Sequence, residues 1–588
     1  MSGFTTFDST VESLSDLLSS IKEFRTQLPD FQRGWVWDDE RIRNLLISIS
    51  LSYPIGSVMM LQTGNPNVKF APRPVEGLNN ANQVEPERLI LDGQQRLTSL
   101  FQSLILRKPV KTRDSRGREI FRHYYINIDK IIDPDVEREE ALVSVPEDKI
   151  VKGPGKVILA DYSDTVKECE AGMLPVDLIL HPAELLGWQT KYFSDPNKIA
   201  ERSMKWSKLV SDIFPRFQNY QIPVIMLRKQ TPKDAVCQVF ENVNTGGVSL
   251  TVFELLTASF AADNFELRND WEEKKAKLTN SSDVFNKILT DISSTDLLQS
   301  ISLLMTYNRK KQKSTAAVSC KRRDILKLTL EDYCTWGDKA VDGFIEAAKF
   351  LQEQNIFSSR DLPYGSQLIP LSALFVELGS QTHNLHVRNM IAQWYWCGVL
   401  GELYGSGTDT RFAKDLPEVI DWINGGSEPT TIRDANFAAE RLYSLRTRNS
   451  AAYKGLHVLL MKAGGKDFIS GVSIDIQTYY GDQIDIHHIF PRAYCEKQDI
   501  DKKMYDSIVN KTPLSYKTNR MIGGNAPSIY LNKIEQERQI SRNELDNLLR
   551  THLIDVDSIR NDHFDKFFER RRNQLIQIIE NTMGKKVI

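Results

Sequence analysis

The sequence predicts a multidomain protein that begins with an α/β domain, continues through an all-α middle region and ends in an α+β domain. Strand patterns followed by a polar turn and a helix occur at 89–105 and again at 222–247. Between about 254 and 450, apolar residues recur at helical spacing with almost no strand signal. Beyond 450, two adjacent histidines lie in a short strand-like segment, 484–491. Together these observations predict three regions of different fold class.

The first domain is expected to open with a short amphipathic helix. Ser9 and Glu12 form a capping-box pattern next to apolar residues at helical spacing. Further along, the apolar run 89–91 predicts a buried strand that leads through a polar turn into a helix. From 108 to about 180 the pattern weakens, with one strand at 124–128. We interpret this part as an insertion in the α/β domain.

Chain length sets the expected number of domains. A chain of 588 residues is too long for one hydrophobic core, and about 150 residues per domain gives about four folding units or a few larger ones. The patterns reduce this number to three regions. Their predicted boundaries are 1–258, with an insertion near 108–220, then 259–445 and 446–588.

Composition excludes several classes of protein. Lys+Arg 75 and Asp+Glu 77 leave a formal net charge of -2, which excludes a histone-like polycation, so any nucleic-acid surface must be local. The 6 cysteines contain no C-x-x-C pair, which argues against a structural zinc module or a disulfide framework. The N-terminal segment does not resemble a signal peptide, and no apolar run reaches the roughly 18 residues of a membrane span. We therefore expect a cytoplasmic protein with no membrane partner.

His487 and His488 form the main candidate for chemistry. Adjacent side chains on a strand point to opposite faces, so two neighbouring histidines seldom pack into one core. One imidazole can bind a divalent cation while the other accepts a proton from water. Phosphodiester hydrolysis needs both functions. The alternative is a pair of histidines that merely line a surface turn.

With the downstream stretch 510–520, this segment resembles the HNH (ββα-metal) nuclease motif. The resemblance implies that His487 is a metal ligand and His488 the general base. It further implies that Asn510 is the structural asparagine and Asn519 the second ligand of Mg²⁺ or another divalent cation. Asn519 stands where many members have histidine, and asparagine is a common alternative there. The zinc-holding cysteine pairs of some HNH proteins are absent.

A second candidate site lies between the predicted strand at 89–91 and the following helix. Its residues are Asp92, Gly93, Gln94, Gln95 and Arg96. Free backbone N–H groups and the helix dipole favour an anion at such a position, and an arginine can bind phosphate oxygens with two donors. The alternative is that Asp92 is simply a helix N-cap. No G-x-x-x-x-G-K-[ST] loop occurs, which excludes an ordinary P-loop enzyme.

Three blocks, 28–37, 89–100 and 240–256, resemble the signature blocks of the ParB/sulfiredoxin-like domain. That domain pairs with an HNH domain in GmrSD-type modification-dependent (type IV) restriction endonucleases, whose relatives BrxU and SspE act in bacterial defence against phage. The stretches 527–531 and 562–572 also resemble the C-terminal nuclease domain of these enzymes.

The resemblance links the DGQQR block to nucleotide binding and hydrolysis. It implies that Asp92, Gln94, Gln95 and Arg96 hold an NTP (ATP, GTP or CTP), because phosphate-binding residues do not reveal the base. Gln32 and Arg33 are implied as phosphate partners. Asn244 and Gly246 are weaker candidates, since their stretch can also end a helix.

Three further features have two interpretations each. Trp35 and Trp37 can stack on a base or anchor the core, and we favour the core. A basic cluster can contact a duplex or form a solvated loop; it comprises Arg309, Lys310, Lys311, Lys313, Lys321, Arg322 and Arg323. The run Arg570–Arg572 can contact phosphates or lie on the solvated face of a helix.

These predictions lead to a functional hypothesis. The chain is expected to be an NTP-regulated endonuclease that cuts modified phage DNA by a single-metal HNH mechanism, with NTPase activity in its first domain. Cutting both strands would be simplest in a homodimer or after two nicks. The alternative is an NTP-switched module that binds DNA or a partner and carries an idle or accessory nuclease domain. An RNA-cleaving toxin is a third option.

Overall fold

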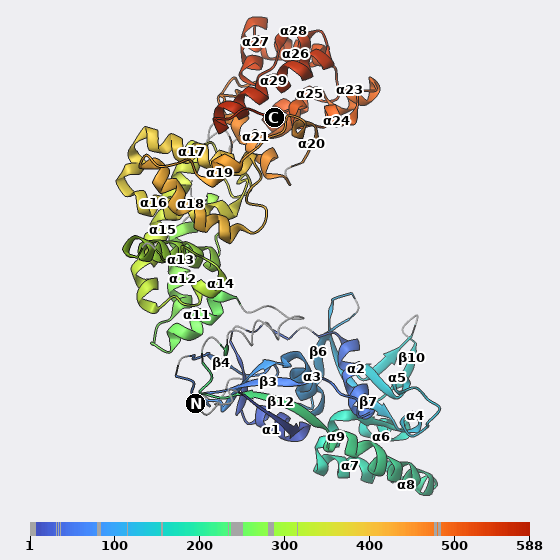
Figure 1. Ribbon diagram of the computed structural model, residues 1–588. Coiled ribbons are helices and arrows are strands. Elements are labelled where there is room, and N and C mark those ends of the chain that lie inside the picture. The colour runs from blue at the N-terminus through green and yellow to red at the C-terminus, as the bar shows by residue number, and fades with distance from the viewer. Residues whose placement is uncertain are drawn as a thin grey trace. The chain divides into compact units, whose positions relative to one another are not determined.

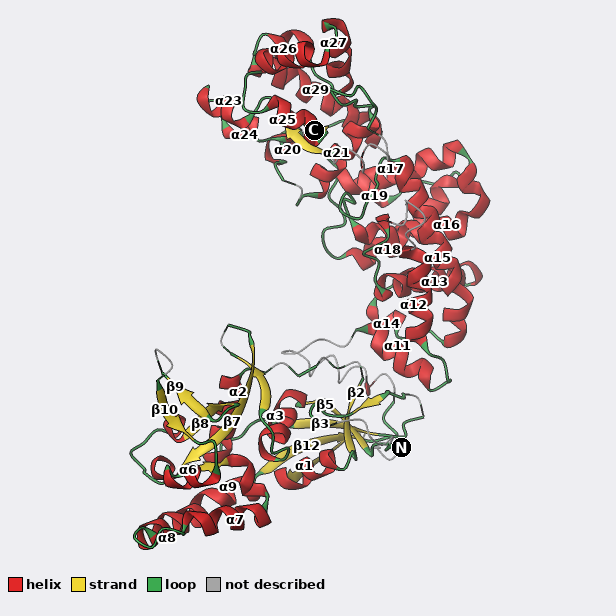
Figure 2. Ribbon diagram, turned by 180° about the vertical axis from the view of Figure 1, so that it is seen from behind, coloured by secondary structure: helices red, strands yellow, loops and turns green. Residues whose placement is uncertain are grey.

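The computed structural model shows two compact units, Met1–Phe265 and Glu266–Ile588 (Figure 1). The first is α/β and the second is largely helical (Figure 2), as the sequence predicts. The predicted division into three domains stays a prediction. The structure describes residues 7–30, 32, 34–35, 37–66, 68–78, 84–114, 116–153, 157–232, 235–236, 251–279, 287–313, 315–447, 449–474, 479 and 484–588.

A six-stranded mixed sheet forms the centre of the first unit. Its strand order is β1-β12-β3-β5-β2-β4, in which β12 is parallel to β3 and β2 is parallel to β5, while the other pairs are antiparallel. The strands are β1 (Phe7–Ser13), β2 (Thr26–Pro29), β3 (Val58–Gln62), β4 (Pro72–Arg73), β5 (Arg88–Asp92) and β12 (Gln221–Leu227). The helices of the same core are α1 (Leu14–Lys22), α2 (Asp39–Ser50) and α3 (Gln94–Leu104). Helix α11 (Val252–Ala261) is the last helix of this unit.

The predicted start of the first helix is wrong. Residues 7–13 form β1, and all seven pair with β12. Helix α1 begins only after Ser13, whose hydroxyl accepts a hydrogen bond from the Asp16 amide at 3.1 Å. Glu12, the expected capping-box partner, instead forms an ion pair with Arg88 at 2.7 Å. Pairing with a distant strand therefore overrides the local capping pattern, which one sequence window cannot show.

The insertion contains more strands than the one that the sequence predicts. That predicted strand falls largely within β7 (Glu119–Asn127), which pairs with β6 (Val110–Arg113), β8 (Leu142–Pro146) and β11 (Met173–Pro175). A hairpin of β9 (Ile150–Lys152) and β10 (Ile158–Asp161) follows. The helices here are α4 (Ile128–Ile131), α5 (Arg138–Ala141), α6 (Thr165–Glu170), α7 (Pro182–Tyr192), α8 (Ile199–Lys208) and α9 (Phe214–Gln218). The predicted helix near 231–242 falls mostly outside the described residues.

Helices dominate the second unit, as the periodicity predicts. They are α12 (Leu267–Thr279), α13 (Ser294–Gln312), α14 (Arg322–Ile325), α15 (Leu330–Glu353), α16 (Leu368–Leu378), α17 (Leu385–Leu400), α18 (Thr408–Ile423), α19 (Thr430–Asp434), α20 (Arg441–Ser444) and α21 (Ala451–Lys462). Helices α15 and α16 approach closely at Gly343, where a Cβ atom would lie 2.5 Å from the Ser372 carbonyl oxygen. A larger residue there would separate the two helices.

The C-terminal part of this unit adds a two-stranded sheet. Strands β13 (Asp485–His488) and β14 (Lys511–Leu514) are antiparallel. The remaining helices are α23 (Arg492–Lys497), α24 (Lys502–Tyr505), α25 (Tyr516–Ile522), α26 (Pro527–Arg538), α27 (Arg542–Thr551), α28 (Val556–Arg560) and α29 (Phe564–Met583).

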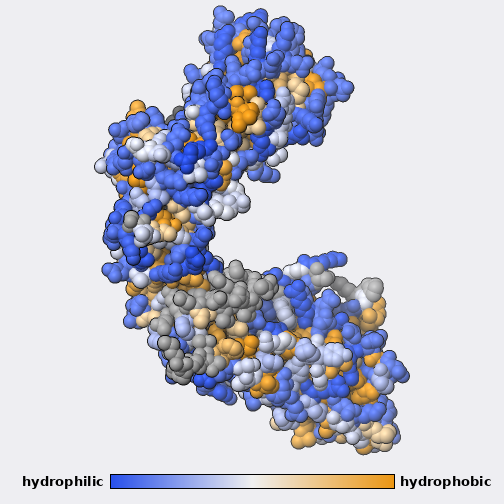
Figure 3. All heavy atoms as spheres, in the orientation of Figure 1, coloured by the Kyte–Doolittle hydropathy of each residue, from blue (hydrophilic) through white to orange (hydrophobic). Residues whose placement is uncertain are grey.

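The visible surface of both units is mostly hydrophilic, with apolar residues in scattered groups (Figure 3). Among the described residues, no helix combines the length and apolar character needed to cross a bilayer.

Candidate functional site

The adjacent histidines lie on a β-hairpin that is followed directly by a helix. His487 is opposite Thr512 and His488 is opposite Lys511 in the β13–β14 pair. Both histidines are half-buried. A single residue, Ser515, separates β14 from helix α25, and its hydroxyl caps the helix by accepting a hydrogen bond from the Thr518 amide at 3.2 Å. The order of elements is therefore strand, strand, helix, with the two histidines on the first strand.

Asn510 fixes the chain just beyond the histidines. Its side chain is fully buried and immediately precedes β14. The amide oxygen accepts a hydrogen bond from the Phe490 N–H at 2.9 Å, and the amide nitrogen donates to the Phe490 carbonyl at 2.9 Å. The same nitrogen donates to the Tyr505 carbonyl at 2.8 Å. One side chain thus connects three parts of the hairpin region and satisfies backbone groups that are shielded from water.

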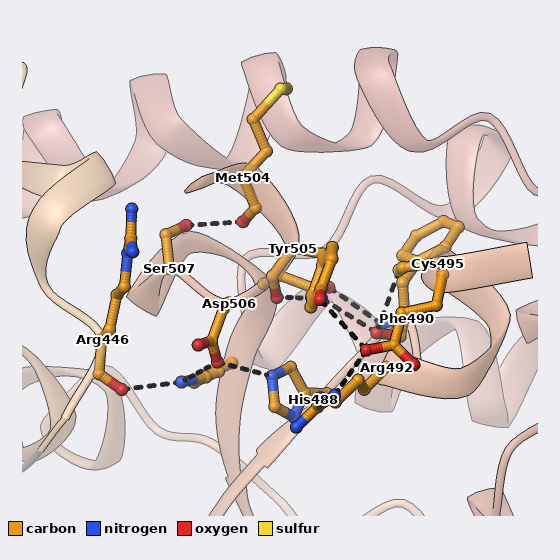
Figure 4. A network of polar contacts seen from close by, with 12 residues as sticks. Arg446, His488, Phe490, Arg492, Cys495, Met504, Tyr505, Asp506 and Ser507 are labelled. Atoms are coloured by element: carbon orange, nitrogen blue, oxygen red, sulfur yellow. Dashed lines mark hydrogen bonds and ion pairs between the residues drawn. The ribbon is translucent and has the colours of Figure 1, made fainter. Parts of the chain in front are cut away.

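His488 faces a carboxylate that sequence analysis did not identify (Figure 4). Its Nε2 lies 3.3 Å from Oδ1 of Asp506, the residue that ends α24. The ammonium group of Lys511 lies 3.0 Å from the same oxygen and donates to the Arg446 carbonyl at 2.8 Å. An ionised carboxylate only accepts hydrogen bonds, so Nε2 carries the proton and Nδ1 keeps its lone pair. Asp506 therefore selects the tautomer in which Nδ1 can act as a base.

Burial and neighbouring charges set the protonation states of His488 and Asp506. Burial lowers the pKa of His488, and the positive charge of Lys511 acts in the same direction, while Asp506 partly opposes both. Burial alone would raise the pKa of Asp506, but Lys511 and His488 outweigh it, so this pKa lies below its ordinary value. At neutral pH the pair is therefore a neutral imidazole and an ionised carboxylate, the state that proton abstraction requires.

Three buried polar side chains hold the helix and the second strand in place. Asp467 accepts hydrogen bonds from the Ser515 N–H at 2.9 Å and the Thr518 hydroxyl at 2.8 Å, which fixes the start of α25. Arg571, fully buried on α29, donates to the backbone carbonyls of residues 509 and 511. His552 bridges Thr512 and the carbonyl of residue 466, each at 2.7 Å. The hairpin is thus anchored from elements far away in the sequence.

His487 and Asn519 are the expected metal ligands. His487 lies on β13, and Asn519 is a half-buried residue of α25. An imidazole nitrogen and an amide oxygen are both suitable ligands for a divalent cation, and two protein ligands leave positions open for water and phosphate. The donor types therefore fit a catalytic cation. Among the described residues, no group of three or more His, Cys, Asp and Glu side chains could hold a metal.

The DGQQR segment lies between β5 and α3, as predicted. Gly93, with φ of 88°, is the N-cap of α3, so the alternative of Asp92 as N-cap is wrong. Glycine has no side chain with which to cap the helix. Arg96 contacts Asp92 at 3.2 Å and donates to the carbonyls of Ile55 at 2.6 Å and Ser57 at 2.8 Å. Its guanidinium thus holds the loop before β3.

The other predicted nucleotide-binding residues are placed around the same segment. Gln94 is buried, and the Gln95 amide donates to the Gly34 carbonyl at 3.4 Å. Gln32 donates to two carbonyls at the end of β5, those of Ile90 at 2.8 Å and Leu91 at 3.0 Å. The structure therefore brings Gln32 next to the DGQQR strand. Arg33, Asn244 and Gly246 lie outside the described residues.

The structure also places the two tryptophans, the basic cluster and the arginine run, for each of which the sequence leaves two interpretations. Trp35 and Trp37 pack against the core of the first unit. In the basic cluster, acidic partners engage Arg309, Lys311 and Arg323. The arginine run is not uniform: Arg570 is exposed and pairs with Asp555 at 2.5 Å, whereas the central member, Arg571, is fully buried. Burial lowers the pKa of Arg571 to about 9.

The fold and these sites define a two-unit protein in which an α/β unit precedes a helical unit with a paired-histidine hairpin. Residues 14–261 match the family model of the GmrSD restriction endonuclease N-terminal domain. An uncharacterized protein of Methanocaldococcus jannaschii is 25% identical to this chain, and the similarity covers 98% of each chain. The match supports the GmrSD restriction endonuclease family and is consistent with a nuclease that acts on DNA in defence.

Proposed function

We propose that this protein is a metal-dependent DNA endonuclease of bacterial anti-phage defence, with the catalytic site on the β13–β14 hairpin. The observation that carries the proposal is the contact of His488 with Asp506 on a strand–strand–helix unit. The family match of the first unit supports nuclease activity on DNA. Modification dependence and NTP regulation are further parts of the proposal, and both rest on the resemblance of the sequence blocks.

In the proposed reaction, His488 removes the proton from the attacking water. Asp506 holds the imidazole through Nε2, so that Nδ1 accepts this proton and the carboxylate stabilises the imidazolium that forms. Asn510 keeps the segment after His488 in place through both polar groups of the Phe490 backbone. A bound divalent cation would supply charge stabilisation at the phosphate and at the departing oxygen. His487 and Asn519 would hold it.

The first unit is proposed to bind an NTP at the start of α3. Support comes from the position of the segment directly before the N-terminus of α3, where the helix dipole favours an anion, and from the placement of Gln32 beside the strand that ends in Asp92. Arg96 would act there by shaping the loop that contains Gly56, since its guanidinium contacts the backbone on both sides of that residue.

A cleavage assay with the full chain tests the proposed function. The protein is incubated with plasmid and with phage DNAs that carry different modifications, with Mg²⁺ or Mn²⁺ and with or without ATP, GTP or CTP. The proposal predicts cleavage that stops when EDTA is added. NTP-dependent retention of DNA without cleavage under every condition would favour the switch module instead. A parallel digest of RNA distinguishes a DNA endonuclease from a ribonuclease: cleavage of RNA but not of DNA would favour the RNA-cleaving toxin.

A further inference from the structure

A cleft beside the two tryptophans of the first unit has the chemistry of a nucleotide-binding site. It has a volume of about 480 Å³. Its walls come from the segment around Trp35 and Trp37, from the second half of α3 and from β6 with the residues just before it. It is distinct from the start of α3, because Asp92 and Arg96 do not line it.

The tryptophans give the cleft a fixed aromatic wall. Each packs against the core of the unit and also lines the cleft. The Trp35 indole N–H donates to the Ser99 hydroxyl at 3.0 Å, and its backbone N–H donates to Glu76 at 3.0 Å. The Trp37 carbonyl accepts a hydrogen bond from Thr112 at 2.7 Å. Rings held in this way lose little freedom when a flat ligand stacks on them.

The charges around the cleft leave a positive excess. Lys111 pairs with Glu119 at 2.8 Å. Lys108 and Arg113 also line the cleft, and both are exposed. In the part of the chain that the structure describes, neither of these two forms an ion pair. Two cations are therefore available for the phosphate of a ligand that lies on the aromatic wall.

Glu76 fixes the wall of the cleft beside Trp35. One of its oxygens accepts a hydrogen bond from the Trp35 backbone N–H at 3.0 Å and pairs with Arg73 at 3.0 Å. The segment that carries Trp35 is therefore held in place before a ligand binds.

We propose that this cleft binds a nucleotide, with its base against Trp35 and Trp37 and its phosphate at Lys108 and Arg113. A free nucleotide and an unpaired nucleotide of a DNA strand share this chemistry. The inference adds a binding site to the proposed nuclease and does not depend on catalysis by His488.

Fluorescence anisotropy of a short, dye-labelled, mixed-sequence DNA strand tests the cleft. The full chain is used in EDTA, which prevents metal-dependent cutting, and free ATP, GTP, CTP and dCMP are added as competitors. Trp37→Ala should weaken binding of the strand or of the free nucleotides by about tenfold or more, and Trp37→Phe should restore most of the affinity. Trp336→Ala, which removes a half-buried tryptophan of the second unit, should bind as the parent does.

The outcomes distinguish the two sources of the nucleotide. Competition by free nucleotides identifies a mononucleotide site, and strand binding without competition identifies a single-strand site. The double variant Lys108→Ala/Arg113→Ala changes only exposed residues. If Trp37→Ala fails to fold, this variant decides whether the cleft binds the nucleotide. The proposal is overturned if the parent binds neither probe, or if this double variant binds as tightly as the parent. If the protein cleaves DNA with Mg²⁺ but binds no nucleotide, the proposed binding site in the cleft is wrong while the proposed nuclease function still holds.

Discussion

Replacement of Asn510 by alanine tests how the hairpin is built. The substitution removes three side-chain hydrogen bonds. It leaves the Phe490 N–H and the Tyr505 carbonyl without these partners in a buried region, while the Phe490 carbonyl keeps its contact with the Cys495 thiol at 3.6 Å. At about 1–3 kcal/mol for each unpaired buried group, we expect a loss of about 3–5 kcal/mol in the free energy of unfolding. This is a large part of the stability of an ordinary domain.

Urea denaturation of the full chain measures this loss, and hydrogen exchange assigns it to the hairpin. Exchange of the Phe490 amide should accelerate strongly in Asn510→Ala, because its acceptor is gone. The control is Asn573→Ala, which changes an exposed residue of α29 and should leave the unfolding free energy within about 0.5 kcal/mol of the parent. A loss below about 1 kcal/mol with unchanged exchange at Phe490 would refute the reasoning.

Three further predictions concern other groups. Asp506→Asn should lower kcat about 10- to 100-fold with little change in KM, and Asp506→Glu should restore part of kcat; equal rates for all three proteins would show that the carboxylate does not orient the base. His552, with its pKa lowered by burial from 6.5 to about 4, should remain neutral in the folded protein while the unfolded chain becomes protonated, so the second unit should lose about 3 kcal/mol of stability as the pH falls from 6.5 to 4. Urea denaturation between pH 6.5 and 4 should show this loss in the free energy of unfolding for the parent and not for His552→Gln. Gly56→Ala should destabilise the first unit more than Gly64→Ala in thermal unfolding, because both positions have positive φ but only a Cβ at 56 would collide with the Arg96 guanidinium; equal destabilisation would contradict the assigned contact.

The sequence predicts the parts of the fold that local patterns encode. The run at 89–91 and the helix after it appear as β5 and α3, and the paired histidines lie on β13. The insertion is less predictable, because the first half of β7 contains only exposed and half-buried residues and lacks a continuous apolar pattern. Strand β1 depends on a partner more than 200 residues away, so a local window assigns its residues to a helix.

For the candidate site, the sequence identifies residue types but not their supports. Asp506 is 18 positions from His488, and nothing in the intervening sequence indicates that their side chains meet. A search for acidic residues inside the predicted hairpin would have produced it as one candidate among several. Arg571 belongs to a run that looks solvated, although its contacts with the backbone of residues 509 and 511 hold β14. Such roles depend on tertiary packing.

The cleavage rate of His488→Ala under single-turnover conditions tests the central claim most directly. The claim is that this imidazole activates water for phosphodiester hydrolysis. The protein is compared with the parent and with His386→Ala, which changes an exposed histidine of α17. We predict a loss of about 10²-fold or more for His488→Ala, the parental rate for His386→Ala, and unchanged NTP hydrolysis in both. Cleavage by His488→Ala at the parental rate would contradict the assignment.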